Sequence, residues 1–328
     1  MKKRSKRIFI IGTFLAVITF IVSLTIGQYE ISIPEIIDII SGKEVDTMSK
    51  NVFFNLRLPR VIMAMLAGIG LSMAGSIYQT IFKNPLAAPD LIGVSSGANA
   101  GAAIAIVCFQ GGILASVFSS FTGGLLAVMS VIGLTTLIKQ RSSGTYILAG
   151  IAIKAISDSI IMTMKYFADP EQQLASIDYW TMGSFANITL TKLQWVLPIF
   201  LIGFVGIILL RWQINLLALD DDEAKMLGVR VGITRCFVLM SSTLLVASTV
   251  CVTGVISFIG LVSPHIARIL LKKSDFSTCM LSGIVGAIIL LFADCLARSL
   301  GSSEIPISIL TSAIGVPFLV YLLYKQGR

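Results

Sequence analysis

Long apolar stretches alternate with short polar segments along almost the whole chain. Residues 8–27 carry no charge, and a helix of that length would extend about 30 Å, enough to cross the hydrocarbon layer of a membrane. Membrane-spanning strands would instead alternate polar and apolar residues over about ten positions. The pattern therefore predicts about ten helical spans, at 8–27, 61–82, 91–109, 113–138, 146–165, 193–210, 236–253, 255–271, 279–297 and 305–324.

The span at 255–271 is the least regular, because Gly254, Gly260 and Pro264 can interrupt or shorten it. Elsewhere small residues recur every four positions, at 64, 68, 72 and 76 and again at 97, 101 and 105. This spacing lets helix backbones approach closely within lipid. It predicts a compact bundle.

Three polar segments interrupt the apolar pattern, at 28–56, 166–192 and 211–235. In the first, Ser32 and Glu35 have the spacing of a capping box at a helix start. The isoleucines at 33, 36, 37 and 40 would give this short helix one apolar face. Such a helix is expected to lie on the membrane surface.

The composition supports this interpretation, with 55% hydrophobic and only 13% charged residues against about 25% charged in soluble domains. We predict an all-α polytopic membrane protein in which residues 1–328 form a single transmembrane domain. The basic start followed by an apolar stretch also resembles a signal peptide, but no small-residue cleavage site closes it, so an uncleaved first helix is expected. The five cysteines show neither disulfide nor metal spacing.

The net charge of +8 is distributed by membrane side. With the N-terminus inside, the inner segments hold seventeen Lys and Arg residues and the outer segments seven. This bias places both termini in the cytoplasm and the chain in the cytoplasmic (inner) membrane, in contact with lipid. The basic charge therefore does not indicate a nucleic acid partner.

The cytoplasmic segment 211–235 contains an acidic stretch, Asp220, Asp221, Asp222 and Glu223. Asp220 can cap a helix that Glu223 helps to close, and Gly228 can end it. The sequence predicts a short helix that exposes Ala224 and Leu227, suited to docking into a groove of a cytosolic partner. The alternative is a solvated connector.

No nucleotide-binding motif is present, because Glu44 follows the one Gly-Lys pair, Gly42 and Lys43. No enzymatic activity, cofactor or metal site is expected. His265 is the one histidine, and its place beside Pro264 favours a structural role.

The motifs together resemble the iron–siderophore, haem and cobalamin ABC permease family, the FecCD type. The resemblance rests on residues 57–60, 67–75, 79, 84–89, 93–98, 180 with 183, 224–228, 258–265 with 268, 293–294 with 298, and 304–306. It covers nearly the whole chain in order. This sequence departs from the family in having Asp220 and Ser308 where glycines are usual, and in the loop 272–276.

The resemblance implies two permease subunits, identical or paralogous, with a cytosolic ABC ATPase dimer and an extracytoplasmic substrate-binding protein. It gives the binding-protein docking role to Arg57, Arg60 and Arg298, whose planar fork can hold a carboxylate. Anchoring of helix ends is the alternative, with Asp294 and Glu304 as internal partners. The segment comprising Asp220, Asp221, Glu223, Ala224, Leu227 and Gly228 would be the coupling helix that contacts the ATPase.

Two further features are weaker. The loop residues Ser142, Ser143 and Thr145 match gate positions of the family loosely. Lys154 and Asp158 lie one helical turn apart within a span, where a mutually neutralised pair is expected and a path-lining role is the alternative.

The predicted function is the permease subunit of a binding-protein-dependent ABC importer for an iron chelate, with ferric siderophore preferred and haem or cobalamin possible. An ion-gradient-driven secondary transporter is the alternative, although it would typically carry mid-membrane ionisable sites in both halves of a repeat. A passive channel or scaffold would give the coupling segment and the outer arginines no role.

Overall fold

A computed structural model describes residues 3–109, 112–138, 143–301 and 304–326. All the regular structure in these ranges is helical. The elements are α1 (Lys3–Thr25), α2 (Ile33–Ile40), α3 (Thr47–Asn51), the π-helix η1 (Val52–Arg57), α4 (Leu58–Ile81), the 3₁₀ turn η2 (Pro89–Ile92), α5 (Val94–Cys108), α6 (Ile113–Leu137), α7 (Ser143–Phe167), α8 (Gln173–Met182), α9 (Leu190–Leu209), α10 (Arg211–Leu216), α11 (Asp221–Met226), α12 (Val231–Thr253), α13 (Ile259–Leu271), α14 (Phe276–Ser299) and α15 (Ile307–Gln326).

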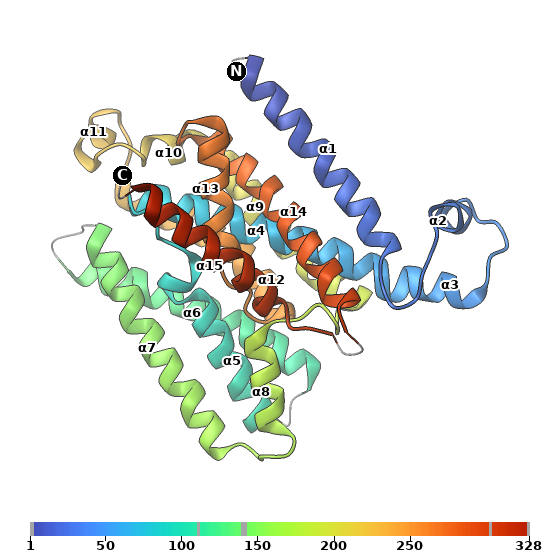
Figure 1. The fold of residues 1–328 in the computed structure, drawn as a ribbon. Coiled ribbons are helices and arrows are strands. Elements are labelled where there is room, and N and C mark those ends of the chain that lie inside the picture. The colour runs from blue at the N-terminus through green and yellow to red at the C-terminus, as the bar shows by residue number, and fades with distance from the viewer. Residues whose placement is uncertain (1–2, 110–111, 139–142, 302–303, 327–328) are drawn as a thin grey trace.

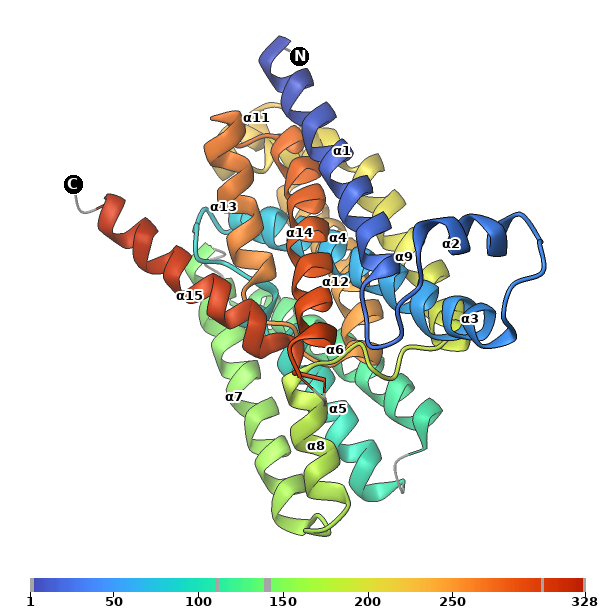
Figure 2. The same ribbon diagram turned by 45° about the vertical axis from the view of Figure 1, so that its right-hand side comes forward.

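Seven helices of the described chain are long and apolar enough to cross a membrane, and α5, α13 and α15 are shorter apolar helices. Each predicted span overlaps one of these ten helices. The all-helical membrane fold is therefore confirmed. Figures 1 and 2 show the start of α1 and α11 toward one end of the bundle, with α8 toward the other. The number of crossings and the side of each terminus stay predictions.

The irregular span at 255–271 is shortened, as its glycines suggested. α12 ends at Thr253, Gly254 takes a φ of +71°, and α13 begins only at Ile259. A Cβ on Gly254 would lie 2.1 Å from the carbonyl oxygen of Trp180, so this turn packs directly on α8. The thirteen residues of α13 reach about 20 Å, less than a full hydrocarbon thickness.

α4 is the central helix, and 83% of an apolar stretch of 18 residues in it is buried inside the protein. A Cβ on Gly75 would lie 1.7 Å from the carbonyl oxygen of Gly260 in α13, and one on Gly68 would lie 2.5 Å from that of Gly286 in α14. In the same way Gly101 of α5 lies against the backbone of Ser119 in α6. These contacts confirm the close packing predicted from the small residues, because only glycine permits such backbone approach.

The helices at the periphery are lightly packed. Of an apolar stretch of 18 residues in each helix, only 11% is buried in α1 and only 17% is buried in α7. The exposed face of α1 is apolar, with Phe14, Ile18 and Val22 among its exposed side chains. Such a surface suits contact with lipid.

The outer polar segments contain short helices. The capping box of α2 forms as predicted, with the Ser32 and Glu35 side chains each accepting the other residue's backbone N–H. The isoleucines of α2 differ in exposure: Ile36 is buried, whereas Ile33, Ile37 and Ile40 are exposed. The membrane-surface contact therefore stays a prediction for the exposed three. α8, in the second segment, was not predicted as a helix.

We expect Gly75→Ala to weaken the packing of α4 on α13, since the new methyl group would force the two backbones apart. Overpacking of this kind costs about 1–3 kcal/mol, so the thermal midpoint of the detergent-purified protein should fall by several degrees. Gly133→Ala in α6 is the matched control, because nothing lies within 4 Å of its Cβ position. Equal midpoints for both variants would contradict the close α4–α13 contact.

Candidate functional site

Three arginines converge where the predicted outer ends of α1, α4 and α14 meet. Arg57 ends η1, Arg60 lies in the first turn of α4 and Arg298 in the last turn of α14. Their exposed fractions are 5%, 7% and 6%, so all three are buried in this chain. The structure therefore brings together the three residues that the sequence resemblance singled out.

Asp294 lies at the centre of this outer arginine cluster and is fully buried. Its Oδ1 lies 2.9 Å from Arg60 Nε, and its Oδ2 lies 3.0 Å from Arg298 Nη2. Glu304, which is partly exposed, lies with Oε1 2.5 Å from Arg60 Nη1. Both internal partners weighed from the sequence are thus in contact with the cluster.

The remaining guanidinium donors cap the C-terminal end of α1. Arg57 Nη1 donates to the carbonyl oxygens of Leu24 and Thr25 at 2.9 and 2.6 Å. Arg298 donates to those of Ser23 and Ile26 at 3.0 and 2.9 Å. Positive groups there satisfy orphan carbonyls and complement the helix dipole. The cluster fastens α1 to α4 and α14, and its docking role stays a prediction.

The acidic segment forms the predicted short helix at the end of the bundle where α1 begins. Asp220 is the N-cap of α11, and its backbone N–H donates to Glu223 Oε2 at 3.4 Å within a capping box. Gly228 follows with a φ of +84°, and its N–H donates to the carbonyl of Lys225. The helix boundaries and both caps match the sequence prediction.

One detail of that prediction is wrong. Ala224 is 1% exposed and faces the bundle, because α11 must seat one side against the spans that it connects. Leu227 is exposed as expected, at 60%, and the neighbouring Met226 at 87%. The apolar surface offered by α11 therefore consists of Met226 and Leu227.

The sequence did not reveal what holds α11 in place. Lys83, just after α4, lies with Nζ 2.5 Å from Asp220 Oδ1. The buried Arg235 of α12 lies with Nη2 2.8 Å from Asp221 Oδ1. The sequence does place opposite charges at span ends on the same predicted membrane side. Many such pairs are possible in it, however, and only the fold shows which of them are in contact.

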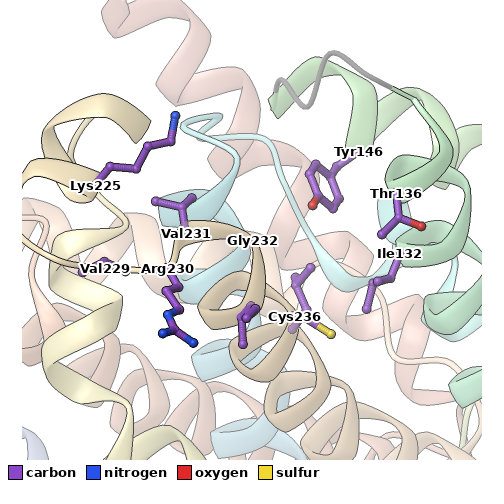
Figure 3. A pocket seen from close by; sticks show the side chains of 11 residues that line it. Ile132, Thr136, Tyr146, Lys225, Val229, Arg230, Val231, Gly232 and Cys236 are labelled. Carbon is purple, nitrogen blue, oxygen red and sulfur yellow. The ribbon is translucent and has the colours of Figure 1, made fainter.

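A groove of about 650 Å³ lies beside α11 (Figure 3). Its wall is formed by the C-terminal half of α6, the start of α7, the first three turns of α12 and, before them, Lys225, Val229 and Arg230. Figure 3 shows Lys225 on the α11 side and Tyr146 and Thr136 across from it. The groove therefore separates α11 from the N-terminal end of α7.

The weaker candidates lie on or beside α7. Ser142 lies outside the described residues, Ser143 begins α7 and Thr145 is half-buried. Lys154 and Asp158 are half-buried, and the ion pairs found in the described ranges do not join them. Their mutual neutralisation and path-lining roles stay predictions.

Other motif residues hold the bundle together. His265 Nε2 lies 2.9 Å from the carbonyl oxygen of Pro85, and Arg268 donates to the Gln79 side chain, joining α13 to α4 and the loop that follows it. Within the described ranges, no group of three or more His, Cys, Asp or Glu side chains is placed to hold a metal ion.

We expect Asp294→Ala to destabilise the protein strongly, because two buried guanidiniums would lose their shared carboxylate. Breaking a buried pair costs about 3–5 kcal/mol, which should lower the thermal midpoint clearly. The control is Asp38→Ala, whose pair with Lys43 is exposed and worth about 1 kcal/mol or less. A midpoint loss no larger for Asp294 than for Asp38 would contradict the structural role of the cluster.

Comparisons with known proteins agree with this architecture. The chain is 39% identical over 323 residues to the molybdate import system permease protein MolB of Haemophilus influenzae, covering 96% of this chain and 95% of that one. It is 36% identical over 285 residues to the hemin transport system permease protein HmuU of Yersinia pestis, covering 84% of each. A solved structure described as an inward-facing conformation of a metal-chelate type ABC transporter superposes with a TM-score of 0.87 at 37% identity, covering 98% of this chain and 99% of that chain.

The sequence also matches the model of the FecCD transport family over residues 15–325. Its relatives are transport permease subunits and not enzymes, and a secondary transporter is not favoured. The chain is therefore a multi-pass membrane permease of an ABC importer and belongs to the FecCD transport family.

Proposed function

We propose that this permease carries an iron chelate across the cytoplasmic membrane, with a ferric siderophore as the preferred cargo and haem or cobalamin as further members of the class. The support is the family itself together with relatives from several organisms. Besides the hemin permease, they include an Fe(3+)-citrate import permease of Bacillus subtilis, 33% identical over 334 residues. Each of these cargoes is a metal held by an organic chelator, which needs no ligands from the permease.

Molybdate is the second candidate, because the relative with 39% identity is a molybdate permease. Molybdate is a small oxyanion, whereas the chelates are large and partly apolar. One family therefore handles very different cargo sizes. This range fits a passage whose selectivity rests mainly with the binding protein.

The proposed complex contains two permease subunits, a cytosolic ABC ATPase dimer and an extracytoplasmic substrate-binding protein. ATP hydrolysis takes place in the separate ATPase, and this chain, residues 1–328, forms one permease domain embedded in lipid. The loaded binding protein docks at the outer arginine cluster. ATP binding moves the ATPase subunits, and α11 carries that movement into the spans.

This subunit catalyses no reaction. Its task is to hold two packings of similar free energy that its partners bias in turn. The two close backbone contacts of α4, with α13 at Gly75 and with α14 at Gly68, favour movement of whole groups of helices over separate bending of each.

The cargo can be identified from the cognate binding protein. We expect the purified protein to retain a ferric chelate with a dissociation constant in the micromolar range or below, and to retain molybdate far more weakly. Titration calorimetry with ferric siderophores, haemin, cobalamin and molybdate checks this. Preferential binding of molybdate would replace the iron-chelate proposal with the second candidate and leave the importer assignment intact.

Docking can be tested with Arg57→Gln, which removes one positive charge without adding a negative one. We expect the affinity for the binding protein to fall about tenfold, mainly through slower association, because the net positive charge of the cluster steers encounter. Surface plasmon resonance at two salt concentrations measures this. The variant's thermal midpoint and ATPase co-purification serve as controls, and unchanged affinity in a folded complex would contradict the docking role.

Coupling can be tested with Leu227→Asp, which places a charge on the exposed apolar face of α11. Loss of a central apolar contact typically costs about 2 kcal/mol or more, so the ATPase should co-purify at least tenfold less. Leu300→Asp is the matched control, because Leu300 is also 60% exposed but lies at the outer end of α14. Equal ATPase recovery with both variants would show that α11 is not the contact.

A further inference from the structure

The three consecutive aspartates of α11 have different partners. Asp220 pairs with Lys83 at the end of α4, and Asp221 pairs with Arg235 of α12. Among the described residues, Asp222 pairs only within α11, with Lys225 at 2.8 Å, and both of those side chains are largely exposed. Two of the three acids therefore connect α11 to the spans, and the third does not.

Arg235 is the buried member of these pairs. Its side chain is only 3% exposed, and its Nε has no hydrogen-bond partner among the described residues. A buried guanidinium needs compensation, and here the contacts are the Asp221 carboxylate on one side and an aromatic ring on the other. That ring belongs to Tyr146, with Arg235 Cζ 5.4 Å from its centroid.

Tyr146 carries the connection into a further helix. It lies in the first turn of α7 and is 5% exposed. Its ring centroid is 5.7 Å from that of Phe82, the residue next to Lys83. The contact between Arg235 and Tyr146 therefore joins α12 to α7 beside the groove of Figure 3, which otherwise separates α11 from α7.

α7 is the helix whose displacement would matter for transport. It is one of the least buried spans, and it bears Lys154, Asp158, Ser159 and Thr163 within its apolar length. The exposed side chains of α1 beyond its first two turns, by contrast, are mainly apolar. Polar and charged side chains within a span usually face a water-filled cavity or other protein rather than lipid.

We propose that Arg235 is the positioning residue that transmits movement of α11 to the N-terminal end of α7, through the ion pair with Asp221 and the ring of Tyr146. This inference rests on the proposed function, since it takes α11 as the contact with the ATPase. Asp221, Arg235 and Tyr146 form one continuous path from the coupling segment to α7. The pair of Asp220 and Lys83 is a second connection, which leads to the end of α4 and reaches Tyr146 only through the neighbouring Phe82.

The test uses the complete complex of permease, ATPase and binding protein in proteoliposomes. In Arg235→Met, which keeps an apolar stem but removes the charge, the ATPase should still co-purify and basal hydrolysis should stay near the wild-type level. Stimulation of ATP hydrolysis by the binding protein should fall about tenfold. Asp222→Asn is the matched control on the same helix and should keep the full stimulation.

Variants of the ring separate transmission from simple support. Tyr146→Phe keeps the aromatic face for the guanidinium and should retain the stimulation, whereas Tyr146→Leu should reproduce the loss seen with Arg235→Met. A merely structural role for the ring would give both substitutions similar effects, in proportion to their thermal midpoints.

A distance measurement tests the movement itself. The accessible native cysteines are first replaced by serine. Spin labels are then attached at Leu148→Cys on α7 and Phe292→Cys on α14, both of which are exposed, and the distance between the two labels is measured. ATP should change this separation in the parent chain and leave it unchanged in Arg235→Met.

If ATP changed the distance between the labels in Arg235→Met as much as in the parent chain, the inference would be overturned. Loss of ATPase binding in that variant would also overturn it, by showing that Arg235 only holds α11 in place. If the ATPase failed to bind the parent chain, the proposed function itself would fall, which is a distinguishable result.

Discussion

The low dielectric of the membrane interior governs this structure, because charged and polar groups there must find partners within the protein. The chain meets this constraint at both ends of the bundle with buried arginines. At the outer end Arg60 and Arg298 share the carboxylate of Asp294. At the opposite end Arg235 lies between Asp221 and Tyr146. Each network joins helices that are distant in sequence.

Between these two networks the bundle is held by backbone contact. Lipid provides no hydrophobic drive for helix association, so close packing must supply it. Gly75 and Gly68 place α4 directly against α13 and α14, and a single added methyl group cannot fit at either position. The middle of the protein is therefore rigid, while α1 and α7 at the periphery are lightly packed. A bundle of this kind transmits force applied at its ends as movement of whole helices.

Much of this architecture could be predicted from local sequence. The lengths of the apolar stretches located the spans. The helix caps at Ser32 and Asp220 formed as expected, because capping depends on residues only three positions apart. Gly254 marked the break before α13 for the same local reason. The close contacts at Gly68 and Gly101 followed from their spacing, which sequence records directly.

What sequence could not provide were contacts between distant segments. The burial of Ala224 depends on where α11 rests, and the pairing of Arg235 with Asp221 depends on the path of the chain between them. The outer arginines were recognised from motifs, but their shared burial around Asp294 required three helices to be placed together. Lys154 and Asp158 lie at ion-pair spacing on one helix, yet spacing alone does not fix side-chain geometry.

This permease is expected to move cargo only when a separate ATPase drives it. The most direct measurement is uptake of the cargo that the cognate binding protein retains. It is followed in proteoliposomes containing the permease and the binding protein, with active ATPase, with hydrolysis-deficient ATPase, or with none, each under an imposed proton or sodium gradient. We expect the cargo to accumulate only in the liposomes that contain active ATPase. Accumulation driven by an ion gradient in liposomes that lack the ATPase would contradict this expectation.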